Sequence, residues 1–184
     1  APFIVFGDSD LSQAVAGCIS AKFATSGQDC LAANRIYVQR ALYDRFIERF
    51  ADATSRLTVG HGLEPGIDIG PMTRPSVAEK CRQQIAQALS AGARLVCGGQ
   101  DSPLGGNFVT PTVLADVTDE MLIAREETFG PVAAILPFDD EREVVRRANA
   151  TEMGLAAYLY TNDLGRAMRL TDQLEYGMVA VNTP

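Results

Sequence analysis

The sequence lacks the signatures of several protein classes. Its four cysteines form no CxxC pair and it has one histidine, so we predict neither a metal site nor a disulfide framework. It has no run of roughly eighteen apolar residues and no signal-peptide pattern, which favours a cytoplasmic protein with no membrane partner. Lysine and arginine are scattered and the net charge is -7, so nucleic acid is not an expected partner.

Strand-like and helix-like segments alternate along the chain. Several strand-like runs are apolar on both faces, which is typical of a parallel sheet covered by helices. We therefore predict that residues 1–184 form one α/β domain, a three-layer α/β/α arrangement with a mostly parallel sheet. The expected strands are 3–6, 35–38, 94–97, 108–117, 131–138, 155–161 and 178–182, and the expected helices lie in 8–27, 41–57, 77–92, 141–150 and 163–174.

The two ends of the sequence look like core elements. The chain starts in the strand-like run APFIVF and stops just after the strand-like run MVAVN. Natural domains rarely begin and end inside their core, so we expect residues 1–184 to be a fragment of a longer chain. No GxGxxG or similar phosphate-binding glycine loop occurs.

The sharpest local feature is the segment SGQDC, from Ser26 to Cys30. It is a glycine-containing turn that presents a thiol between a helix and a strand. Sulfur attacks carbonyl carbon well, and the backbone N–H of the nucleophile can hold the resulting oxyanion. The alternative interpretation is an inert, buried thiol, which we favour for Cys18, Cys81 and Cys97 because they occupy apolar helix or strand positions.

Two motifs carry a resemblance to a known family. The stretch KFATSGQDCLAANRIYV resembles the active-site segment of aldehyde dehydrogenases, and REETFGPV, residues Arg125 to Val132, resembles their second signature. The resemblance covers nearly the whole chain and implies the family's catalytic, cysteine-bearing domain. Further segments similar to the family, in the expected order, are GNFVTPTVL, NATEMGLAAYLYT and LEYGMVAVNTP.

The resemblance implies a reaction and the residues that perform it. Cys30 would add to an aldehyde, the adduct would pass hydride to NAD or NADP, and water would release a carboxylic acid from the thioester. Glu127 would accept hydrogen bonds from the nicotinamide ribose, and Phe129 would pack beside the nicotinamide. Lys80 falls where some relatives hold the adenine ribose. Without the resemblance, REETF would be interpreted as a solvated charge cluster.

Parts of the family's machinery are not found in this sequence. The family's general-base glutamate, its oxyanion asparagine and most of its dinucleotide-binding domain would lie before APFIVF. We therefore expect the 184-residue chain alone to bind the dinucleotide poorly and to show no turnover. The full-length enzyme is expected to be a homodimer or homotetramer.

Within the family, the sequence is most similar to succinate-semialdehyde dehydrogenases. This similarity makes succinate semialdehyde the first candidate substrate. These enzymes commonly carry an arginine for the distal carboxylate where this chain has Ala24. Asp29 is a second departure, because a carboxylate that faced the Cys30 sulfur would disfavour the thiolate. Ala32 replaces the second cysteine of some members, so a disulfide switch is excluded there.

Three alternatives stay open. A cysteine hydrolase would need an imidazole beside the sulfur, and only His61, in a glycine-rich loop, is available. A CoA-acylating relative would share the cysteine turn and transfer the acyl group to CoA. A non-enzymatic scaffold would keep the fold, although the presence of Cys30, Glu127 and Phe129 together argues against it.

Overall fold

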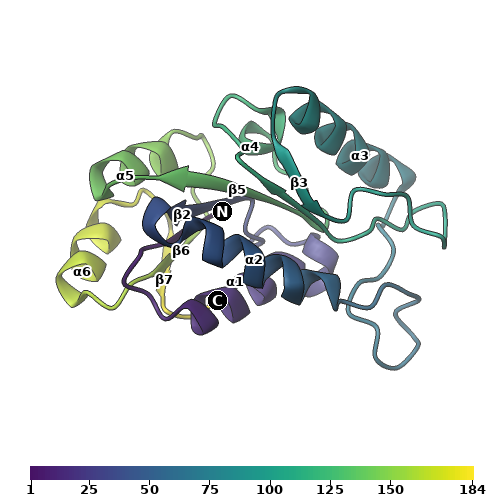
Figure 1. Cartoon of the computed structure of the whole chain (residues 1–184), viewed down its shortest axis with the longest axis horizontal. Coiled ribbons are helices and arrows are strands. Elements are labelled where there is room, and N and C mark those ends of the chain that lie inside the picture. Colours follow the sequence, from purple (N-terminus) through teal and green to yellow (C-terminus); the bar gives the residue numbers. More distant parts are fainter.

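The computed structural model describes all 184 residues and has a seven-stranded sheet at its centre (Figure 1). The strand order is β3-β4-β5-β2-β1-β6-β7, and only the β3–β4 pair is antiparallel. The predicted mostly parallel sheet is therefore confirmed. The strands are β1 (Pro2–Val5), β2 (Arg35–Gln39), β3 (Arg94–Cys97), β4 (Thr112–Ala115), β5 (Val132–Phe138), β6 (Ala156–Tyr160) and β7 (Met178–Val181).

Helices cover both faces of this sheet. Along β1, Phe3 packs into a core shared with α1 and α2, whereas Ile4 packs into a second core shared with α3, α5 and α6. Alternate side chains of the central strands enter opposite cores, which explains why these strands are apolar on both faces. The helices are α1 (Leu11–Phe23), α2 (Tyr43–Ser55), α3 (Pro75–Ser90), α4 (Leu122–Arg125), α5 (Glu141–Asn149) and α6 (Leu164–Gln173), with 3-10 segments η1 (Ala24–Gly27) and η2 (Arg40–Leu42).

The first helix ends earlier than predicted. The α-helix stops at Phe23, and Thr25 and Ser26 adopt left-handed conformations with φ of 53° and 59°. A left-handed residue cannot continue a right-handed helix. The expected helical end at Gly27 is thus wrong, and the last four residues form the 3-10 segment η1.

The segment expected as one long strand at 108–117 is also shorter. Only Thr112–Ala115 joins the sheet, because Pro111 has no N–H to donate to a neighbouring strand. The four-residue helix α4 was not predicted at all, since a single turn has no periodicity to detect. None of the helices has the length and apolar content needed to cross a lipid bilayer.

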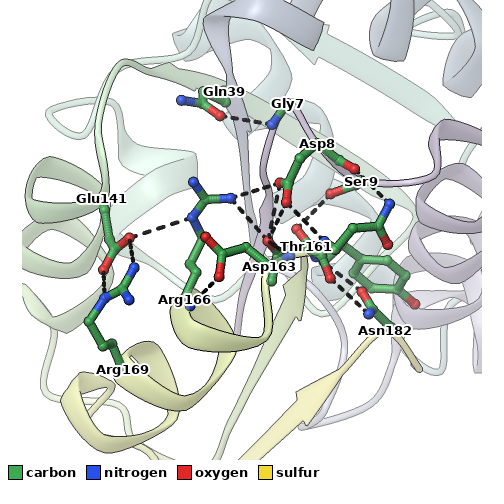
Figure 2. Close-up of polar contacts among 12 residues, drawn as sticks. Gly7, Asp8, Ser9, Gln39, Glu141, Thr161, Asp163, Arg166, Arg169 and Asn182 are labelled. Atoms are coloured by element: carbon green, nitrogen blue, oxygen red, sulfur yellow. Dashed lines mark hydrogen bonds and ion pairs between the residues drawn. The ribbon is translucent and has the colours of Figure 1, made fainter.

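At the carboxyl ends of β1, β6 and β7, polar side chains tie the strands together (Figure 2). The Asp8 carboxylate accepts hydrogen bonds from the Thr161 hydroxyl at 2.9 Å and from Arg166 of α6 at 2.8 Å. The Asn182 side chain bonds both the N–H and the C=O of Thr161. The predicted site residues Cys30, Glu127 and Phe129 lie at the opposite, amino ends of β2 and β5.

Candidate active site

Cys30 is an exposed thiol in the turn that precedes the amino end of β2. Neither its sulfur nor its backbone N–H makes a hydrogen bond within the chain. The other three thiols differ, because Cys18 and Cys81 are buried and Cys97 is half-buried. Burial raises the pKa of each of these three thiols. Cys30 is therefore the accessible cysteine of the chain.

The backbone before Cys30 is held in an unusual shape. Thr25, Ser26 and Gly27 are three successive left-handed residues, a conformation that a β-branched residue such as threonine rarely adopts. Gly27 packs directly on Gly130, and a Cβ at Gly27 would overlap the carbonyl oxygen of Gly130. Only glycine allows this approach, which brings the cysteine turn against the segment that carries Glu127.

The cysteine turn is anchored on its other sides by side chains. Ser26 accepts a hydrogen bond from the N–H of Gly70, and Gln28 accepts one from the N–H of Thr73, both at 2.8 Å. The Asp29 carboxylate accepts the N–H of Leu31 at 2.8 Å. This contact directs the Asp29 Oδ1 atom toward the backbone that follows Cys30.

Glu127 lies in the irregular segment between α4 and β5. Its side chain is exposed, and its carboxylate makes no hydrogen bond or ion pair within the chain. Phe129 is half-buried and has a φ of 58°, which is strained for a bulky residue. The Lys80 ammonium from α3 donates a hydrogen bond to the backbone oxygen of Glu127. Three of the predicted residues therefore belong to one neighbourhood.

One cleft of about 250 Å³ contains both Cys30 and Glu127. Arg35, Arg125 and Asn34 also line it, whereas Phe129 and Lys80 do not. A larger hollow of about 570 Å³ adjoins this cleft and shares Arg35 and Arg125 with it, but it contains no cysteine. We take the smaller cleft as the candidate site because Cys30, the predicted nucleophile, lines it.

Several residues of this region were missed by the sequence reasoning. Asn34 bonds the segment around Glu127, and the Tyr158 hydroxyl donates to the carbonyl of Leu31 at 2.9 Å. Arg35 is buried and donates to the carbonyl of Ala148 at 2.9 Å. No sequence signal could have found these contacts, since each joins positions that are 89 or more residues apart.

A buried lysine lies beneath the same turn. Lys22, in the last turn of α1, is 1% exposed and has no carboxylate in an ion pair with it. Burial lowers its pKa to about 8, and the nearby groups that act on it are Cys81, Cys18 and Glu127. The region around the cysteine turn therefore holds a costly buried amine.

His61 does not lie in the Cys30 cleft. Its side chain is exposed, and its ring packs edge-on against Phe108, with 5.1 Å between the ring centres. The imidazole that a cysteine hydrolase requires beside the sulfur is thus not supplied by this residue.

Comparisons with known proteins identify the family of the chain. The profile of the "Aldehyde dehydrogenase family" matches residues 1–184. The chain belongs to the aldehyde dehydrogenase family. It is 53% identical to 3-sulfolactaldehyde dehydrogenase of Pseudomonas putida and 50% identical to the succinate-semialdehyde dehydrogenase [NADP(+)] GabD of Escherichia coli. Each alignment covers 100% of this chain and 38% of the relative, so the aldehyde dehydrogenase chain spans about 38% of their length.

Solved structures give the same result for the fold. A crystal structure of an Escherichia coli NADP-dependent enzyme matches with a TM-score of 0.98 at 50% identity. Succinate-semialdehyde dehydrogenase from Burkholderia pseudomallei matches with a TM-score of 0.98 at 49% identity. Both matches cover 100% of this aldehyde dehydrogenase chain and 38% of the other.

Proposed function

We propose that residues 1–184 are the cysteine-bearing catalytic domain of an NAD(P)-dependent aldehyde dehydrogenase in which Cys30 is the nucleophile. The observation that carries this proposal is the exposed Cys30 thiol in a cleft shared with Glu127. Family membership supports an oxidoreductase reaction on an aldehyde. The buried or half-buried state of the other three thiols leaves Cys30 as the candidate.

The free groups around Cys30 fit the first chemical step. The sulfur would add to the aldehyde carbon, forming a C–S bond while the carbonyl oxygen becomes an oxyanion. The backbone N–H of Cys30, which has no partner within the chain, would donate to that oxyanion. The left-handed turn at Thr25, Ser26 and Gly27 would keep both groups pointing out of the protein.

The residues around Glu127 fit the nicotinamide-ribose end of a dinucleotide. The Glu127 carboxylate is exposed and free of partners, so both oxygens can accept hydroxyl groups. The half-buried Phe129 ring would pack against the nicotinamide, and Lys80 would contact the dinucleotide from α3. When bound, the dinucleotide would supply the hydride acceptor. The chain has no glycine-rich phosphate loop, so it would bind the rest of the cofactor weakly.

The substrate that we propose is a short aldehyde with a distal anionic group, with succinate semialdehyde as the first candidate. The names of the relatives at about 50% identity include sulfolactaldehyde, succinate semialdehyde and aspartate semialdehyde, all of which bear an anionic group. Arg35 and Arg125 outnumber the single carboxylate of the cleft, Glu127, which supports an anionic ligand. Ala24 leaves the position of the cation open.

The direct test is adduct formation with carbon-13-labelled succinate semialdehyde. We expect one saturable hemithioacetal signal per chain in the NMR spectrum of the wild type and none in Cys30→Ser. With NAD+ or NADP+ added, we expect no continuing rise in NADH or NADPH absorbance from the 184-residue chain alone. An adduct that persists in Cys30→Ser would overturn the assignment of the nucleophile.

The full-length enzyme separates the hydrolytic reaction from CoA acylation. We expect its turnover of succinate semialdehyde to be independent of CoA and to yield the free acid. Turnover that requires CoA would instead establish the acylating alternative. Its mass in solution would test the expected homodimer or homotetramer.

A further inference from the structure

Three backbone polar groups around Glu127 are held by side chains from elsewhere in the chain. Asn34 donates from Nδ2 to the carbonyl of Glu126 at 3.2 Å and accepts the N–H of Thr128 at Oδ1 at 3.0 Å. Lys80 donates to the carbonyl of Glu127 itself. The segment has no helix or strand of its own after α4 ends at Arg125. Its position therefore depends on these side-chain contacts.

Asn34 connects the start of β2 to the segment that carries Glu127. It immediately precedes β2, which pairs with β1 on one side and β5 on the other. Its Nδ2 also donates to the carbonyl of Ile123 in α4 at 3.1 Å. The same residue lines the cleft that contains Cys30 and Glu127. One amide thus joins a fixed strand to the whole 123–128 segment.

The chemistry of these contacts requires an amide. Nδ2 faces two carbonyl oxygens and must donate, whereas Oδ1 faces an N–H and must accept. Asparagine supplies both functions, and alanine supplies neither. We propose that Asn34 is a positioning residue that holds the Glu127 carboxylate beside the Cys30 thiol. This inference deepens the proposed function and rests on it for treating the two groups as one site.

A matched contact elsewhere provides the control. Asn149, also half-buried, donates to the carbonyl of Gln173 at 2.8 Å and accepts the N–H of Glu175 at 3.1 Å. It clamps two backbone segments in the same way but does not line the Cys30 cleft. Loss of Asn149 should therefore cost similar stability without affecting Cys30.

The experiment measures the electrostatic potential at the Cys30 sulfur. Rates of Cys30 alkylation by neutral iodoacetamide and by anionic iodoacetate are compared at low salt, with the modified peptide quantified by mass spectrometry. A carboxylate nearby slows the anionic reagent, so Glu127→Gln should lower the iodoacetamide-to-iodoacetate ratio by about twofold. Asn34→Ala should lower it to the same extent, and the double variant should show no further change.

Each outcome either supports or overturns the positioning role of Asn34. Support requires matching, non-additive effects of Asn34→Ala and Glu127→Gln and an unchanged ratio in Asn149→Ala. The inference is overturned if Asn34→Ala keeps the wild-type ratio, if the two effects add, or if Glu127→Gln has no effect. If Asn34→Ala does not fold, Asn34→Leu takes its place with the same expectation, because leucine has neither a donor nor an acceptor. Normal aldehyde adduct formation at Cys30 in the wild type would then show that the positioning role had failed and the proposed function had not.

Discussion

The polar groups at the two ends of the parallel strands differ in whether they are paired within the chain. At the carboxyl end, Asp8 is bonded by Thr161 and Arg166, and Asn182 bonds both backbone groups of Thr161 (Figure 2). At the amino end, the Cys30 thiol, its N–H and the Glu127 carboxylate have no partner within the chain. Paired groups stabilise a fold, whereas exposed groups left unpaired can meet a ligand.

Backbone conformation separates the two ends in the same way. Among non-glycine residues with positive φ, Asp116 and Asn182 follow the carboxyl ends of β4 and β7. Aspartate and asparagine tolerate this conformation. Thr25 and Phe129, which flank the cleft, belong to types that do not. The amino end therefore concentrates strain, which is typical of functional sites.

The largest expected effect is the loss of the proposed nucleophile. Cys30→Ser should reduce the rate of covalent capture of a thiol-reactive aldehyde analogue by at least about a thousandfold, because serine is a much weaker nucleophile. Cys97→Ser is the matched control and should keep the wild-type rate. Mass spectrometry of the intact chain measures both. Equal loss in the two variants would contradict the assignment of Cys30 as the reactive thiol.

Gly27 tests the strained approach of the cysteine turn to Gly130. Gly27→Ala adds a left-handed alanine and a backbone overlap, and should lower the free energy of unfolding by roughly 3–4 kcal/mol. Gly66 also has positive φ but has open space around it, so Gly66→Ala should cost only about 1–2 kcal/mol. Urea unfolding gives both values, and equal costs would refute the tight approach.

Lys22 should make the stability of the amino end depend on pH. Its folded pKa of about 8 lies below the unfolded value of 10.5, so the unfolded chain binds more protons between these values. Stability should therefore rise with pH across this window, by up to about 3 kcal/mol. Burial raises the pKa of the Cys18 and Cys81 thiols, which acts in the opposite direction. Lys22 lowers both of these pKa values, so they rise further in Lys22→Met and the stability of the variant falls more steeply as the pH rises.

The measurement is the difference in unfolding free energy between wild type and Lys22→Met from pH 7 to 10. The variant should be the more stable at pH 7, and the gap should narrow as the pH rises. A constant gap would mean that the amine does not titrate in this range.

Asp8 tests the carboxyl end and has the smallest expected effect. Asp8→Ala removes charged hydrogen bonds to Arg166 and Thr161 and should cost about 2 kcal/mol of stability. The rate of Cys30 alkylation in the folded variant should be unchanged, because Asp8 and Cys30 lie at opposite ends of the parallel strands. A slowed Cys30 reaction would show that the carboxyl-end network also shapes the site.

The sequence was sufficient for the fold because its strands are apolar on both faces and alternate with amphipathic segments. It also placed Cys30 in an exposed turn, since glycine and polar residues precede it. It could not reveal the contacts of Asn34, which reach residues about ninety positions away. It also missed the left-handed Thr25 and Phe129, because their conformations are imposed by packing rather than by residue preference.

The central claim is that Cys30 alone among the four thiols is poised to react. Competitive labelling of the native chain with limiting iodoacetamide, followed by peptide mass spectrometry, measures this directly. Cys30 should be modified at least about tenfold faster than Cys97 and before any detectable reaction of Cys18 or Cys81. Labelling of Cys30 no faster than the other three would contradict the account.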